Sequence, residues 1–108
     1  MINTRQKAEW LGDGLLNFYV KAKLLEKFPD ASMKELSDMF SKIISNKHLN
    51  MFAGKQSWRG SDHVEEEIFL FAQNEGIEGA EKLIDRIIDF YFGKMYGRYP
   101  VVYKRLPQ

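Results

Sequence analysis

Two pairs of carboxylates have spacings that place both members of each pair on one face of a helix. Glu9 and Asp13 are four residues apart, and Asp62 and Glu65 are three apart. Like charges at these spacings cost a helix about 0.2–0.5 kcal/mol per pair. On two facing helices, however, the four carboxylates would form an oxygen-only pocket suited to Mg²⁺ or Mn²⁺. Water activated by such a metal can attack a phosphodiester.

Glycines flank one of these carboxylates. Gly12 and Gly14 stand on either side of Asp13 in the stretch AEWLGDGLLNFY, although glycine weakens a helix relative to alanine. A residue without a side chain lets a second backbone or a substrate approach closely. Glycines and carboxylates together therefore fit a metal site at a close approach.

Spacing alone leaves other interpretations open. Asp62-x-x-Glu65 also fits a capping box at a loop-to-helix junction, and Asp62 pairs equally well with Glu66 at four-residue spacing. Glu9 and Asp13 also fit a solvated helix face. His48 and His63 are scattered and accompanied by no cysteine, which makes a zinc site a poor match.

The elements that must position these residues are helices. Pro29 ends the first helix, and Ser32 with Glu35 forms a capping box for the second. A loop is expected over residues 54–61. The apolar period predicts an all-α protein, with helices over Thr4–Lys27, Ser32–Ser45, Asn46–Ala53, Asp62–Asn74 and Ile77–Phe92.

Apolar residues recur along these helices at steps of three and four. The first helix has a stripe of Leu11, Leu15, Phe18, Ala22 and Leu25. In the fourth, the residues expected to point inward are Val64, Ile68, Phe71 and Ala72. The last runs through Ala80, Leu83, Ile84, Ile87, Ile88 and Tyr91.

Length and composition indicate one soluble domain. The 108 residues, 44% of them hydrophobic, suit a single domain over residues 1–108, with a flexible or docked tail from about residue 93. Cysteine is absent, which fits a reducing compartment. No apolar run approaches ~20 residues and no signal peptide pattern opens the chain. We expect a cytoplasmic protein that does not contact membranes.

The net charge of +1 is unevenly distributed. Residues 39–61 contain no acid, and neither does the tail. Such segments can show basic surface to a polyanion if the fold gathers them. The expected phosphate contacts are Lys42, Lys47, Lys55 and Arg59.

Four segments in order resemble the ribonuclease III family. EWLGDGLL resembles its signature E-[aromatic]-L-G-D-x-x-L, and FPDASMKELSDMFSKIISNKHL resembles the segment that follows it. SDHVEEEI and NEGIEGAEKLI resemble its A-D-x-x-E-A helix and the turn and helix after it. The resemblance runs from Glu9 to about Ile84.

This resemblance implies an all-helical, homodimeric endonuclease domain that cleaves double-stranded RNA with Mg²⁺, for which Mn²⁺ can substitute. By motif position the catalytic and metal-binding carboxylates are Glu9, Asp13, Asp62 and Glu65, which selects Glu65 over Glu66. Trp10 falls where the family places a dimer-packing residue; a core tryptophan is the alternative.

Several positions depart from the family pattern. Gln6 and Met33 stand where acids are usual, and only eight residues precede Glu9. No double-stranded-RNA-binding domain follows within the 108 residues, so the architecture is closest to mini-ribonuclease III. These departures favour a second hypothesis, a non-catalytic module that binds structured RNA or a ribonucleoprotein. A third hypothesis, a helical dimerisation domain without nucleic acid, predicts no binding of divalent metal.

Overall fold

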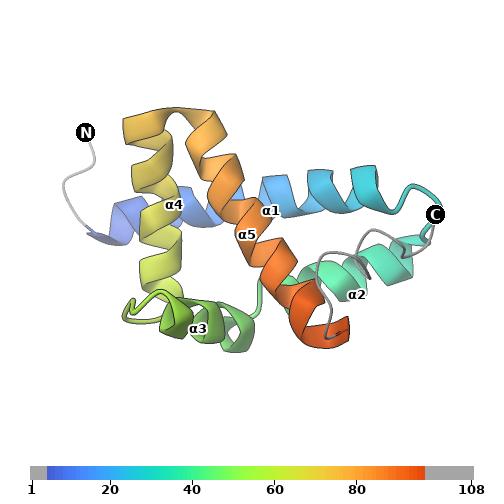
Figure 1. The fold of residues 1–108 in the computed structure, drawn as a ribbon. Coiled ribbons are helices and arrows are strands. Elements are labelled where there is room, and N and C mark those ends of the chain that lie inside the picture. Colours follow the sequence, from blue (N-terminus) through green and yellow to red (C-terminus); the bar gives the residue numbers. More distant parts are fainter. Residues whose placement is uncertain (1–4, 97–108) are drawn as a thin grey trace.

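The computed structural model describes residues 5–96, which form five α-helices joined by short connections (Figure 1). They are α1 (Arg5–Lys27), α2 (Met33–Ile43), α3 (Asn46–Lys55), α4 (Ser61–Glu75) and α5 (Ile77–Tyr96). The described residues contain no strand. The predicted all-α class is confirmed.

The longest helix, α1, is crossed by α4 and α5 (Figure 1), and its most extensive packing is with α4. One face of α1 is buried along its whole length, through Ala8, Gly12, Leu16, Val20 and Leu24. Lys23 at the far end of α1 lies 3.6 Å from a carboxylate oxygen of both Glu81 and Asp85 on α5. The helix therefore serves as the base on which α4 and α5 are placed.

The apolar stripe predicted for α1 is not the one that the core uses. Leu11, Phe18 and Leu25 remain 37%, 63% and 57% exposed. The helix has two apolar faces, and the core takes the one that contains Leu16 and Val20. Periodicity detects an amphipathic helix but does not choose between two apolar faces.

The connection from α1 to α2 follows the sequence prediction. The helix ends before Pro29, and Phe28 is buried. The Ser32 hydroxyl accepts from the Glu35 amide at 3.1 Å, while the Ser32 amide donates to the Glu35 carboxylate at 2.8 Å. Since these two bonds satisfy amides that the first turn leaves without partners, they fix the start of α2.

Three helix ends differ from the prediction by two residues or more. α2 ends at Ile43, because Ser45 caps α3 by accepting from the His48 amide at 3.1 Å. α3 continues to Lys55, and α5 continues through Gly93 to Tyr96. A glycine inside a helix costs only about 1 kcal/mol, which does not end a helix whose preceding residues, Tyr91 and Phe92, are buried. Residues 97–108 of the predicted tail lie outside the described residues.

The inward residues of α4 and α5 are largely as predicted. Val64 and Ile68 are buried, and Phe71 and Ala72 pack half-buried against the core. The predicted stripe of α5 is buried throughout: Ala80, Leu83, Ile84, Ile87, Ile88 and Tyr91. Within residues 5–96, no helix combines the length and the hydrophobicity needed to cross a membrane.

Candidate active site

The backbones of α1 and α4 touch at Gly12. A Cβ atom placed on Gly12 would lie 2.6 Å from the carbonyl carbon of Glu65 and closer still to its oxygen. The predicted close approach is therefore confirmed for Gly12. No second backbone approaches Gly14, where an added Cβ would meet nothing within 4 Å, and close approach of a substrate there stays a prediction.

This contact brings the two pairs of carboxylates together. The Glu65 side chain on α4 is hydrogen bonded to Asp13 on α1, and it experiences the negative charges of Asp13, Asp62 and Glu9. Burial, the bond to Asp13 and these charges together raise the pKa of the Glu65 carboxyl from about 4.5 to about 8. At neutral pH, Glu65 therefore carries a proton and shares it with Asp13.

Two of the alternatives left open by spacing do not hold. α4 begins after Gly60, and no side chain caps it, so Asp62 and Glu65 do not form a capping box. Instead Asn50 on α3 accepts from the Ser61 amide at 2.6 Å. Glu9 and Asp13 do not simply line a solvated face, because both are half-buried and act on Glu65.

Glu66, the other candidate partner of Asp62, is engaged elsewhere. Its Oε1 lies 2.8 Å from Arg59 Nη2 and 3.8 Å from Arg5 Nε. Neighbouring residues of α4 therefore differ in role: Glu65 belongs to the acidic cluster, and Glu66 pairs with the arginines.

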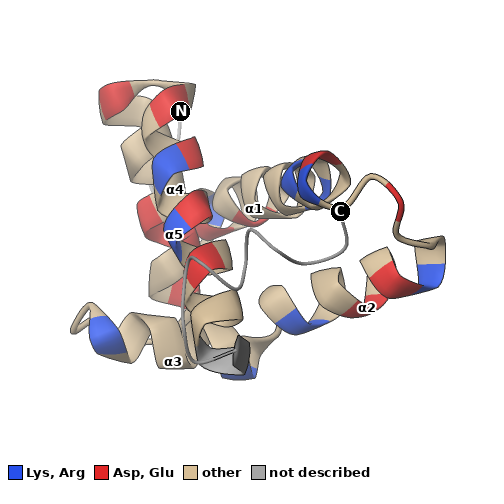
Figure 2. Ribbon diagram, turned by 45° about the vertical axis from the view of Figure 1, so that its right-hand side comes forward, with Lys and Arg blue, Asp and Glu red and all other residues tan. Residues whose placement is uncertain are grey.

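A polar cavity of about 230 Å³ adjoins the carboxylates. Its lining is Arg5, Glu9, Asn50, Arg59, Gly60, Ser61, Asp62 and His63. Of the predicted phosphate contacts, Arg59 thus shares a cavity with two site carboxylates. The others, Lys42, Lys47 and Lys55, are exposed on α2 and α3, and α3 carries basic but no acidic residues (Figure 2).

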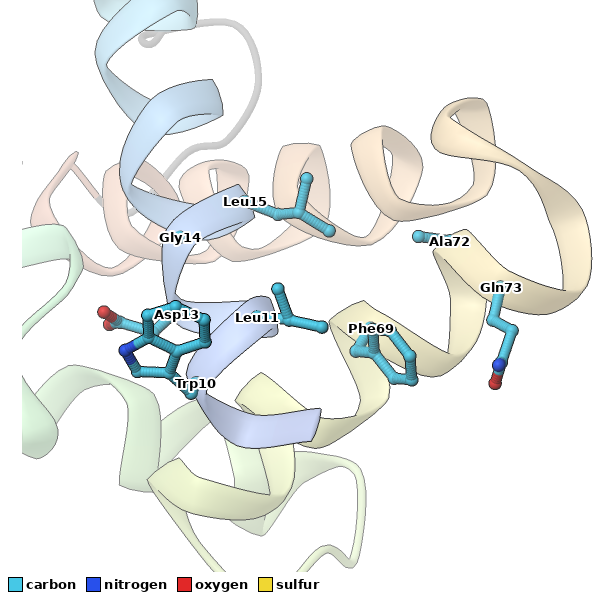
Figure 3. A pocket seen from close by; sticks show the side chains of 8 residues that line it. All are labelled: Trp10, Leu11, Asp13, Gly14, Leu15, Phe69, Ala72 and Gln73. Atoms are coloured by element: carbon cyan, nitrogen blue, oxygen red, sulfur yellow. The ribbon is translucent and has the colours of Figure 1, made fainter. Parts of the chain in front are cut away.

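Trp10 is exposed, and the alternative of a core tryptophan is wrong. Its side chain is 75% exposed at one edge of an open cavity of about 610 Å³. Figure 3 shows Leu11, Leu15 and Phe69 along the same cavity, where α1 meets α4. Asp13 also lines it, so the apolar surface begins next to the carboxylate cluster.

Comparison with known proteins shows the family of the chain. The sequence profile described as the ribonuclease III domain matches residues 6–99. The chain belongs to the ribonuclease III domain family.

Curated relatives of this ribonuclease III domain include the proteins named Ribonuclease 3 from Francisella tularensis subsp. novicida (strain U112) and from subsp. tularensis (strain WY96-3418). Each is 28% identical to it over 91 residues. The matched segment is 84% of this chain and 37% of each relative, so the chain spans little more than a third of their length. No solved structure matches the chain.

The donor set of the ribonuclease III domain fits a divalent cation in its chemistry. All four carboxylates offer oxygen, which Mg²⁺ and Mn²⁺ prefer. Burial is the largest cause of the raised pKa of Glu65, and the charges of Asp13, Asp62 and Glu9, which a cation would offset, add to it. Within residues 5–96, however, no three acidic or histidine side chains lie in positions from which they could hold a metal ion. Because Glu65 holds its proton up to a pKa of about 8, that proton would have to leave before all four carboxylates could hold a cation.

Sequence reasoning missed two residues near the site and assigned no role to either histidine. Asn50 and Arg5 belong to no recognisable motif. Asn50 on α3 accepts from Ser61, and Arg5 on α1 pairs with Glu66, so both act through contacts with α4. His63 receives a bond from the Arg59 amide at 3.1 Å and lies 3.2 Å from Glu67. His48 is buried, with its Nδ1 2.7 Å from the carbonyl oxygen of Ile43.

Proposed function

We propose that this ribonuclease III domain is a divalent-metal-dependent endoribonuclease that hydrolyses phosphodiester bonds of double-stranded or structured RNA. Membership of the family supports ribonuclease chemistry. The observation that carries the metal-dependent form is the Asp13–Glu65 pair, held across the α1–α4 contact at Gly12 with Glu9 and Asp62 nearby.

In this proposal the four carboxylates hold Mg²⁺, or Mn²⁺ in its place. A bound cation would supply an activated water and would offset negative charge on the scissile phosphate. Glu9 and Asp13 approach from α1 and Asp62 and Glu65 from α4, so both helices contribute ligands. Glu65 must first release the proton that it shares with Asp13. No side chain is assigned as a dedicated general base, because a metal lowers the pKa of its bound water.

The substrate is proposed to be bound through its backbone. The grooves of A-form RNA favour recognition by shape and phosphate over base edges. Lys42, Lys47, Lys55 and Arg59 are the proposed contacts, and we expect affinity to fall steeply with salt. The proposed location is the cytoplasm, where such RNA is found and where a chain without cysteine needs no disulfide.

The exposed apolar side of α1 supports a homodimer. Trp10 is 75% exposed, and Leu11, Leu15 and Phe69 line the same open cavity across the α1–α4 contact. Phe18, which lies further along α1, is 63% exposed. Contiguous apolar surface of this kind marks an interaction site. A second copy of the chain would cover it and bring a second carboxylate cluster to the same RNA. Trp10→Ala should yield monomers in sedimentation with an unchanged circular dichroism spectrum; an unchanged dimer would contradict this packing role.

The experiment that tests the function is cleavage of a labelled RNA duplex with Mg²⁺ or Mn²⁺. We would compare the natural chain with Asp13→Asn and Glu65→Gln, and with Glu78→Gln as an exposed control on α5. A metal site contributes several kcal/mol of transition-state stabilisation, so both site variants should lose about a hundredfold or more in rate. The control should cut normally.

A second candidate follows from the positions that lack the family's usual acids. Gln6 is exposed and Met33 is 73% exposed, which leaves these places without carboxylates. A non-catalytic module that binds structured RNA or a ribonucleoprotein would tolerate such changes. Intact RNA binding without cleavage, across several duplexes and both metals, would select this function over the nuclease.

A further inference from the structure

We propose that Arg5 and Arg59 form a clamp for one backbone phosphate of the RNA, adjacent to the phosphate that is cut, and that Glu66 positions them. The proposal rests on the proposed RNA substrate. It assigns a role to the polar cavity beside the carboxylates, and it adds Arg5 and Glu66 to the site.

The two arginines reach the same place from different elements. Arg5 opens α1 one helical turn before Glu9, so both side chains project from one face. Arg59 lies in the loop before α4, three residues ahead of Asp62. Both guanidinium groups lie near a single oxygen of Glu66, at 2.8 Å for Arg59 and 3.8 Å for Arg5. Each arginine therefore lies beside a carboxylate of the proposed metal site.

These ion pairs are poorly suited to a purely structural role. The side chains of Arg5 and Arg59 are 59% and 52% exposed, and exposed ion pairs contribute little to stability. Glu66 lies against both arginines, and the carboxylates of Glu9 and Asp62 line the same cavity. The arginines therefore attract a phosphate in the proposed metal-bound site, where a cation offsets these carboxylates. A guanidinium group binds phosphate through two parallel hydrogen bonds, and half-exposed arginines are free to do so.

The clamp also addresses an electrostatic difficulty of the site. RNA phosphates are repelled by the acidic cluster of Glu9, Asp13 and Asp62, and a bound cation is occupied by the scissile group. A positive pair at the edge of the cluster attracts the neighbouring phosphate and fixes the strand relative to the carboxylates. Cleavage position then depends on which phosphate the arginines hold.

The test pairs single uncharged phosphates in the RNA with single variants in the protein. Each duplex carries one methylphosphonate, and its position moves by one nucleotide from duplex to duplex. The duplexes are titrated, in the presence of Mg²⁺, into the Glu65→Gln protein, which is not expected to cut, and the affinity is measured. At one position we expect neutralisation to weaken binding about tenfold or more, as for other hydrogen bonds between charged groups. With Arg59→Ala or Arg5→Ala added, that position should lose most of its effect.

Two further variants separate the clamp from general attraction. Lys34→Ala removes one positive charge from α2, where Lys34 is 84% exposed, and it should leave the position dependence unchanged. Glu66→Gln removes a negative charge, so it should bind duplex at least as tightly overall. Because Glu66 then no longer positions the arginines, the methylphosphonate at the sensitive position should weaken the binding of this variant less than it weakens the binding of the protein with Glu66. Thermal denaturation confirms that each variant is folded.

The outcomes distinguish this proposal from the nuclease itself. If the loss of affinity from an arginine variant and the loss from each methylphosphonate simply add, at every position of the strand, the clamp is overturned. If the natural chain cuts RNA but no phosphate depends on Arg5 or Arg59, the clamp fails and the nuclease stands. If it never cuts yet the dependence is present, the nuclease fails and the clamp stands. If it binds no RNA, both fail.

Discussion

Gly12→Ala should force apart the contact between α1 and α4 on which the whole site depends. The added Cβ would lie 2.6 Å from the carbonyl carbon of Glu65, whereas carbon atoms pack best at about 3.5–4.0 Å. The two helices must therefore separate by at least about 1 Å, since the carbonyl oxygen lies closer still. No rotamer change relieves the contact, because the obstructing atoms belong to the α4 backbone.

The expected loss can be estimated from opposing effects. Overpacking a core costs about 1–3 kcal/mol and occasionally more, and a backbone obstruction belongs at the upper end. Replacing glycine by alanine returns about 1 kcal/mol of helix propensity. We expect a net loss of about 2 kcal/mol, which corresponds to about 8 °C or more in Tm for a domain of this size. If the chain cuts RNA, a 1 Å shift of Glu65 should also slow it by about a hundredfold.

The matched control is Gly14→Ala on the same helix. Its added Cβ meets nothing within 4 Å, so it should be neutral or stabilising by about 0.5–1 kcal/mol. Urea denaturation of both variants measures the difference. A Gly12→Ala protein within about 0.5 kcal/mol of the natural chain would refute the reasoning, because it would mean that α1 and α4 do not touch at this point.

Other predictions follow from the acidic cluster and from the helix caps. The metal-free protein should lose stability as the pH rises from about 4.5 to about 8, because folded Glu65 keeps its proton through that range while the unfolded carboxyl has lost it. Urea midpoints measured across this range should depend less on pH in Glu65→Gln. Mg²⁺ should raise Tm more at about pH 8.5 than at about pH 6, because binding requires that proton to leave; an equal shift at both would contradict the assignment of Glu65. Ser32→Ala should cost about 1 kcal/mol through loss of the α2 cap, whereas the exposed Ser41→Ala should change the urea midpoint little.

Local signals in the sequence predicted most of the fold. Pro29 and the Ser32–Glu35 capping box act within a few residues of themselves, and both mark boundaries that the structure retains. Gly93 misled the prediction because a glycine stops a helix only where tertiary packing does not continue it. The choice between the two apolar faces of α1 depends on which one meets α4 and α5, and this information is not local.

In the candidate site, too, local spacing predicted some features and tertiary contacts decided the others. Helical spacing placed Glu9 with Asp13 and Asp62 with a glutamate one turn later, but it gave no reason to prefer Glu65 to Glu66. The rotation of α4 against Gly12 makes the distinction, since it turns Glu65 toward Asp13 and Glu66 toward the arginines. Arg5 and Asn50 could not be predicted because their roles depend entirely on contacts between helices distant in sequence.

Because the carboxylates are shared between α1 and α4, the order of synthesis decides when the site first exists. Asp13 leaves the ribosome 49 residues before Asp62. At about 5–20 residues per second, this is an interval of roughly 2–10 s. During it, the nascent chain presents Glu9 and Asp13 without their partners. A polypeptide released before α4 is made would carry half of the acidic cluster and none of the backbone that Gly12 accommodates, so every product that stops before α4 lacks the assembled site.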